Sequence, residues 1–182
     1  MEYLIQNLPP EVICTRITDE ALSLLTLAGE KAIPAIAPLE AALPLAAKAW
    51  ELPGSFLTEK TNLLEQGKAQ AAAGETVLTK EPLLESYDGW EITLLLWNLF
   101  QTAVRLEDRE ERHIFYAAAQ LLEEALDYHC FLYRTGENYL KMFWGMFRNM
   151  VRKSDPEKRK AIFEKAYTLT NRLCRNGIDR SV

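Results

Sequence analysis

Residues 137–153 read ENYLKMFWGMFRNMVRK, and this stretch decides the expected fold. On a helix, at about 100° per residue, its apolar side chains cover more than half of the circumference. The narrow polar side that remains is made of Lys141, Gly145, Arg148, Asn149 and Arg152. A helix with so wide an apolar arc either lies at the centre of a fold or forms an interface. We predict a central helix with Phe143 in the core, and the interface is the alternative.

Capping boxes mark the helix starts around this stretch: in each, a short polar residue is followed three residues later by Glu. The pairs are Asp88 with Glu91, Asp108 with Glu111, and Ser154 with Glu157. Each box precedes apolar residues that recur every three or four positions, as on one buried face of a helix. The connections are short, which favours antiparallel neighbours. The sequence therefore predicts an all-α fold, an up-down helical bundle with at least four helices from residue 88 onward.

The first 86 residues are rich in alanine and proline and are expected to form a kinked helical part of the same single domain. Three of the prolines fall within residues 32–50. A proline inside a helix removes a backbone hydrogen bond, so short helical pieces are predicted there. An irregular arm is expected over 1–17, a helix capped by Thr18-Asp19, and a linker over 74–86 with a short strand at 76–78. No internal repeat at a solenoid period is detected.

Charge is distributed unevenly along the chain. Residues 1–147 carry 22 acidic and 11 basic side chains, and residues 148–182 carry 4 and 10, which together give the net charge of −5. The three widely spaced cysteines suit neither a disulfide framework nor a zinc site. No apolar run is long enough to span a bilayer. We therefore expect a cytoplasmic protein with reduced thiols and no membrane partner.

Two acidic pairs in the bundle resemble a known enzyme signature. Glu107-x-x-Glu110 is followed, after 13 intervening residues, by Glu124-x-x-Asp127. This pattern resembles that of the all-α nucleotide pyrophosphohydrolases, the MazG-like and dimeric dUTPase-like enzymes. The resemblance implies a Mg²⁺-dependent enzyme in which the four carboxylates, from two helices, hold the metal against nucleotide phosphates. The alternative is a solvated acidic face.

Other catalytic patterns are weak. Glu110-x-x-His113 matches one half of a di-iron motif that requires a second copy, so His113 is expected to be an ordinary surface residue. His129 falls within an apolar stripe and is expected to be buried and hydrogen-bonded. The chain has no nucleophile elbow and no glycine-rich phosphate loop. No catalytic residue is predicted.

We predict a non-enzymatic helical interaction or adaptor protein, without a cofactor, that binds another macromolecule: a protein partner or a second copy of itself. Aromatic residues on an otherwise polar face and a stripe of cations with seven-residue spacing support this prediction. The expected interaction surface comprises Tyr116, Phe131, Trp144, Arg148, Arg152, Lys158, Lys165 and Arg172. The alternatives are the Mg²⁺-dependent pyrophosphohydrolase and a nucleic-acid-associated subunit that uses the basic C-terminal helices.

Overall fold

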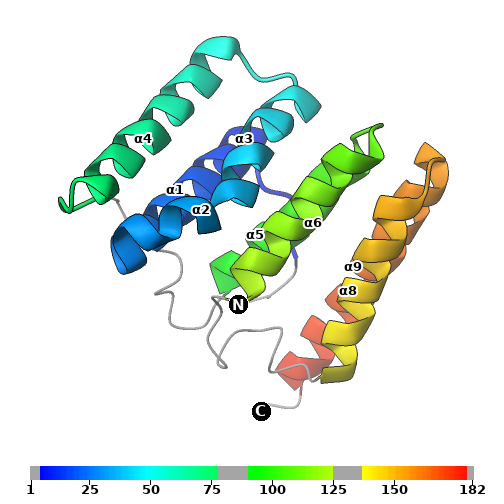
Figure 1. Ribbon diagram of the computed structural model, residues 1–182. Coiled ribbons are helices and arrows are strands. Elements are labelled where there is room, and N and C mark those ends of the chain that lie inside the picture. Colours follow the sequence, from blue (N-terminus) through cyan, green and yellow to red (C-terminus); the bar gives the residue numbers. More distant parts are fainter. Residues whose placement is uncertain (1–4, 78–89, 125–136, 180–182) are drawn as a thin grey trace.

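The computed structural model describes residues 5–77, 90–124 and 137–179, and their regular structure is helical throughout, which confirms the all-α prediction. The helices lie side by side in a row of layers (Figure 1). From one end to the other the order is α4 (Gly54–Ala72), α1 (Pro10–Ala28) with α3 (Ala37–Ala49), α5 (Trp90–Val104) with α6 (Arg109–Glu124), and α8 (Glu137–Arg152) with α9 (Pro156–Asp179). The last two pairs are the predicted up-down bundle.

The N-terminal part becomes helical earlier than predicted. Helix α1 begins at Pro10, because a proline in the first helical turn has no N–H to lose and its fixed φ suits a helix. The predicted irregular arm is therefore wrong from residue 10 onward. Thr18 lies inside the helix, where its hydroxyl donates to the Cys14 carbonyl at 3.0 Å instead of capping a start.

The prediction of short helical pieces in the Ala/Pro-rich segment is confirmed in part. A short helix, α2 (Ala32–Ala35), is separated from α3 by Ile36, whereas α3 continues through Pro44 as one helix of 13 residues. No described helix is by itself long and apolar enough to cross a membrane; only residues 10–35 taken with 37–49 reach that length and composition, across an 82° bend. The predicted strand is absent at Thr76 and Val77, and the remainder of the predicted linker lies outside the described residues.

Aspartates cap the two well-described helix starts of the bundle. The Asp108 Oδ1 atom accepts hydrogen bonds from the backbone N–H groups of Glu110 at 2.7 Å and Glu111 at 3.3 Å, as predicted. At the start of α9 the predicted cap, Ser154, is wrong by one residue. Asp155 accepts the N–H of Glu157 at 3.0 Å, because the helix begins at Pro156. The third predicted cap, Asp88, lies outside the described residues.

Asp155→Ala should lower the free energy of unfolding by about 1 kcal/mol, because the first turn of α9 loses its side-chain acceptor. The neighbouring Ser154→Ala should change it by no more than about 0.5 kcal/mol, as for other surface substitutions. Urea denaturation of both variants measures the difference. Equal losses at the two positions would contradict the assignment of the cap.

Helix α8 buries its apolar arc within the bundle and Phe143 lies in the core as predicted, but the helix belongs to the last layer of the stack and not to its centre. Phe143, Phe147 and Met150 are fully buried. The Phe147 ring stacks on Phe100 of α5 with ring centroids 4.6 Å apart. The wide apolar arc of this helix is therefore used within the chain, between α5, α6 and α9.

The two hairpins of the bundle share a sequence pattern with a period of 47 residues. Trp-x2-Phe-x3-Val-Arg-x2-Asp-x-Glu-x-Arg runs from Trp97 to Arg112 and again, 47 residues later, from Trp144 to Arg159. In both copies the pattern spans the end of one helix, the connecting turn and the start of the next. The expectation that the chain has no internal repeat is therefore wrong.

The interactions of the two copies correspond as well. Arg112 and Arg159 are both about 1% exposed. Arg112 donates to the carbonyl oxygens of Leu106 (2.9 Å) and Glu107 (2.7 Å) in its own hairpin, and Arg159 donates to the matching Lys153 (3.2 Å) and Ser154 (2.7 Å). Each Nε–H group donates a hydrogen bond to a backbone carbonyl of the other hairpin. Arg112 donates to Val151 at 3.0 Å, and Arg159 donates to the matching Val104 at 3.4 Å.

Reciprocal contacts of this kind arise from an approximate two-fold axis, which we call the pseudo-dyad. It exchanges α5 with α8 and α6 with α9, and accordingly α6 packs on α8 as α9 packs on α5. The Phe100–Phe147 stack joins matching residues. The edge contact of Phe100 with Phe163 (5.1 Å) is repeated by Phe147 with Tyr116 (5.3 Å). The pseudo-dyad thus exchanges the two hairpins, and each surface of one hairpin corresponds to the equivalent surface of the other.

Candidate interaction site

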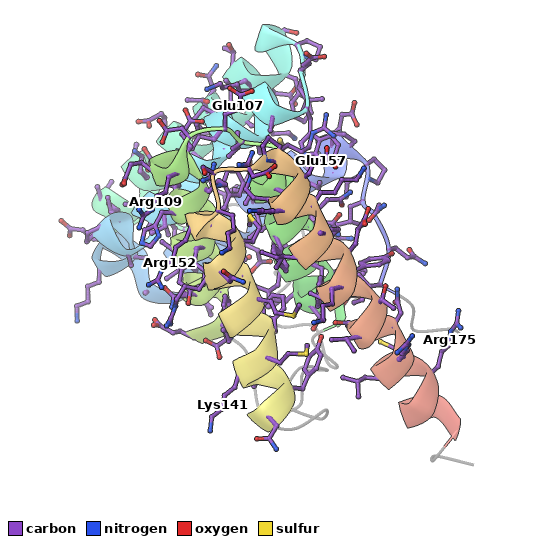
Figure 2. All side chains as sticks on the ribbon, turned by 90° about the vertical axis from the view of Figure 1, so that its right-hand side faces the viewer. Glu107, Arg109, Lys141, Arg152, Glu157 and Arg175 are labelled. Atoms are coloured by element: carbon purple, nitrogen blue, oxygen red, sulfur yellow. The ribbon has the colours of Figure 1, made fainter. Side chains whose placement is uncertain are left out.

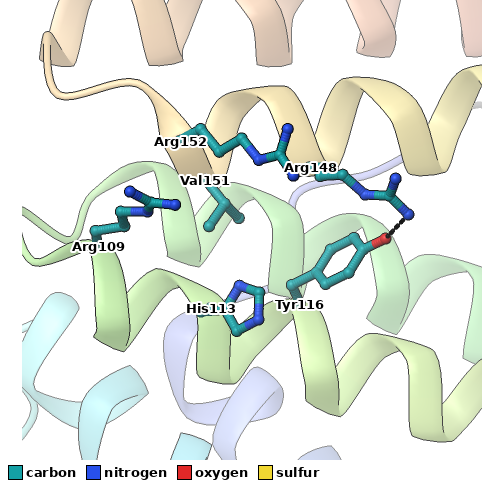
Figure 3. A pocket seen from close by; sticks show the side chains of 6 residues that line it. All are labelled: Arg109, His113, Tyr116, Arg148, Val151 and Arg152. Atoms are coloured by element: carbon teal, nitrogen blue, oxygen red, sulfur yellow. Dashed lines mark hydrogen bonds between the residues drawn. The ribbon is translucent and has the colours of Figure 1, made fainter.

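A small pocket opens between α6 and α8 (Figure 3). Its volume is about 120 Å³. We call it the arginine pocket; its lining residues are Arg109, His113, Tyr116, Arg148, Val151 and Arg152. Two pairs of side chains four residues apart form it, one on each helix, because residues at that spacing lie on the same helical face.

The arginine pocket is electropositive. Within the described residues, none of its three guanidinium groups forms an ion pair with a carboxylate. Arg148 donates one hydrogen bond, to the hydroxyl of the buried Tyr116 at 3.2 Å. The Tyr116 ring is held by His113 on one side, with centroids 5.9 Å apart, and by the edge contact with Trp144 at 5.7 Å. The floor of the pocket is therefore fixed, while Arg109 and Arg152 are exposed.

The size of the pocket limits what it can hold. A water molecule takes up about 30 Å³ of liquid, and pockets for drug-sized ligands measure about 300–1,000 Å³. Only a small group fits, such as a carboxylate or a phosphate. Guanidinium groups bind both through paired N–H donors.

The structure brings together part of the predicted interaction surface. Arg148, Arg152 and Tyr116 line one pocket, and Trp144 packs beside it. Tyr116 was expected on an outward, polar face of its helix; this is wrong, because it is 5% exposed in the contact between α6 and α8. Phe131 lies outside the described residues.

The remaining predicted cations, Lys158, Lys165 and Arg172, are exposed along α9 and do not line the arginine pocket. Two pocket residues, Arg109 and His113, were missed by the sequence analysis. Their spacing on α6 matches that of Arg148 and Arg152 on α8, which is a signal that becomes informative only when the two helices are known to pack together.

The predicted metal ligands do not converge in the described part of the chain. Glu110 lies in the first turn of α6 and Glu124 at its end. Fourteen residues of helix separate them by about 21 Å, so they cannot hold one ion. Glu107 precedes the same helix, and Asp127 lies outside the described residues. Among the described residues no three His, Cys, Asp or Glu side chains are grouped as metal ligands.

The described thiols are chemically protected. Cys14 and Cys174 are free and buried. Burial raises the pKa of each thiol to about 11. Because the thiolate is the reactive form, neither is suited to act as a nucleophile. Of the candidates from the sequence, Cys130 and His129 lie outside the described residues.

Comparison with protein families, curated proteins and solved structures finds no match to this chain.

Proposed function

We propose that the chain is a helical interaction module that binds another macromolecule, and that the arginine pocket receives an anionic group of that partner. One observation carries the proposal. Three arginines line one pocket together with the buried Tyr116, and none of them has a carboxylate partner among the described residues, in a chain of net charge −5. Guanidinium groups without a carboxylate partner, in a protein that carries excess acidic residues elsewhere, favour an anionic group supplied by a binding partner.

The volume of the pocket supports a macromolecular partner over a metabolite. A site of about 120 Å³ encloses one anionic group and leaves the rest of the ligand outside. Specific binding then requires contacts on the surface around the pocket, and specific protein interfaces extend over roughly 800 Å² on each partner. The pyrophosphohydrolase alternative receives no comparable support, because its described carboxylates are distributed along α6.

Titration of the ¹⁵N-labelled protein with inorganic phosphate and with an acetylated hexaglutamate peptide tests the proposal. Both probes should shift the side-chain N–H signals of Arg109, Arg148 and Arg152. Arg148→Gln should weaken binding about tenfold, because a hydrogen bond between charged groups contributes roughly 1.5–3 kcal/mol.

Lys31→Gln is the control, because it removes one exposed cation in the N-terminal part of the chain, away from the bundle surfaces discussed here. It should leave the affinity for both probes unchanged. Equal weakening by the two variants would mean that the probes respond to net charge alone. That result, or the absence of shifts at the pocket arginines, would contradict the proposed function.

A further inference from the structure

The pseudo-dyad relates the outer surface of the last hairpin to a surface that is covered. In the stack, α1 and α3 pack against one side of the α5–α6 hairpin, and the α8–α9 hairpin packs against the other (Figure 1). The pseudo-dyad exchanges α5 with α8 and α6 with α9. The covered side of α5 and α6 therefore corresponds to the side of α8 and α9 on which no other described helix packs. We call this free side the terminal face; Figure 2 looks onto it, with Lys141 and Arg152 along α8 and Arg175 along α9.

The covered side shows how a helix docks there. Lys48 of α3 pairs with Glu111 of α6, with the Nζ and Oε1 atoms 3.0 Å apart. Just beyond the end of α3, the Trp50 indole lies 4.1 Å from the Arg105 guanidinium and donates to the Thr102 hydroxyl at 3.0 Å. Arg105 also donates to the backbone carbonyl of Ala49 at 3.2 Å. The docked helix thus presents its C-terminal end to an arginine and its side to α6.

The terminal face has residues at the positions equivalent to those that contact α3, but two of them are lysines where the covered side has other residues. The pseudo-dyad places Arg152 where Arg105 lies and Asn149 where Thr102 lies. Lys158 replaces Glu111, and Lys165 replaces the fully buried Ala118. All four replacements are exposed. Gly145, the counterpart of Asn98, has open space around its Cα: a Cβ atom there would meet nothing within 4 Å.

We propose that the terminal face docks an acidic helix of a partner protein, in the way that α3 docks on α6. The partner helix would present a carboxylate to Lys158, where α3 presents Lys48 to Glu111. Its C-terminal carbonyl would meet Arg152, where Ala49 meets Arg105. This inference rests on the proposed function, because it specifies the partner of that interaction module.

The spacing of the cations supports a helix as the occupant. Lys158, Lys165 and Arg172 are seven residues apart, so they recur about every 10.5 Å along α9. Acidic residues in a heptad pattern on a partner helix recur at the same interval. The net charge of −5 weakens the long-range attraction of any anionic partner, and it counts most against a nucleic acid, whose duplex carries one negative charge about every 1.7 Å.

Two helix-stapled peptides that copy residues 37–52 are suitable probes: an unsubstituted peptide, which retains Lys48, and a substituted peptide, which carries Lys48→Glu. Each carries a fluorescent label, and anisotropy reports its binding to the full chain. The substituted peptide should bind about tenfold tighter than the unsubstituted peptide, because a like-charge contact with Lys158 becomes an ion pair. The protein variant Lys158→Glu should invert this preference.

Lys160→Glu is the matched control, because Lys160 is exposed on the same helix but points about 200° away from Lys158. This variant should retain the preference of the unchanged protein. Equal binding of the two peptides would overturn the inference. The inference would also be overturned if Lys158→Glu left the binding of both peptides unchanged. That result would indicate that the peptides displace α3 from its own place on the α5–α6 hairpin.

A single-stranded oligonucleotide distinguishes the competing class of partner. Saturable binding tighter than that of the substituted peptide, lost when Lys158, Lys165 and Arg172 are all reversed to Glu, would overturn the inference in favour of nucleic acid. The slope of log affinity against log salt would then fall by about 0.7 for each lost phosphate contact.

If the arginine pocket binds its anionic probes but neither peptide binds, the proposed function stands and the acidic-helix inference fails.

Discussion

Replacing Arg112 by alanine should lower the free energy of unfolding by about 4–5 kcal/mol. The side chain donates to four backbone carbonyl oxygens, those of Leu106, Glu107, Val151 and Lys153, at 2.7 to 3.0 Å. The Lys153 carbonyl keeps its bond from Arg159, but each of the other acceptors left without a donor costs about 1–3 kcal/mol, and the vacated volume adds to this loss. Burial, together with the nearby Arg159, lowers the pKa of Arg112, so the site tolerates the cation only because these carbonyls accept from it.

Chemical denaturation monitored by circular dichroism measures the effect. Arg109→Ala removes an exposed arginine from the same helix and should change stability by no more than about 0.5 kcal/mol. Arg159→Ala should cost less than Arg112→Ala, because it bonds three carbonyls, one of them at 3.4 Å. A loss below about 1 kcal/mol for Arg112→Ala would mean that water satisfies the freed carbonyls.

Phe143→Ala should destabilise the protein by about 3–5 kcal/mol, because truncating a fully buried aromatic ring leaves a cavity. The ring lies 4.9 Å from Trp97 and 6.0 Å from Phe100, and neither can fill the space without leaving its own contacts. Leu27→Ala is the control, because Leu27 is 62% exposed and its loss should be small. Thermal melts and size-exclusion chromatography on the same samples test the prediction. A variant that keeps its melting temperature but elutes as a smaller species would place Phe143 in a subunit interface.

The helices of the bundle were predictable because their signals are local. The apolar arc of residues 137–152 and the cap at Asp108 need no knowledge of the rest of the chain. Local signals also explain the errors. Ser154 and Asp155 are adjacent acceptors, and only the position of Pro156 in the first turn decides between them. Thr18-Asp19 has the composition of a cap, but α1 already runs through it from Pro10.

The arginine pocket and the pseudo-dyad were not predictable from the same kind of evidence. The pocket joins Arg109 and His113 to Arg148 and Arg152, which are far apart in the chain, and packing alone decides that they meet. The identities of the repeat are confined to the turn of each hairpin and the residues beside the pseudo-dyad, where the shared interactions require them. Elsewhere the copies diverge, as at Ala118 and Lys165.

The pseudo-dyad gives the bundle the internal geometry of an isologous homodimer within one polypeptide. In a true homodimer both ends carry the same sequence, so any residue that suits a ligand at one end is imposed on the other. A single chain is free of this restriction. Here one end carries Glu111 and Ala118 on the helix against which α3 packs, and the other carries Lys158 and Lys165 at the matching positions. Joining the two halves covalently therefore allows one symmetric scaffold to offer two chemically different ends.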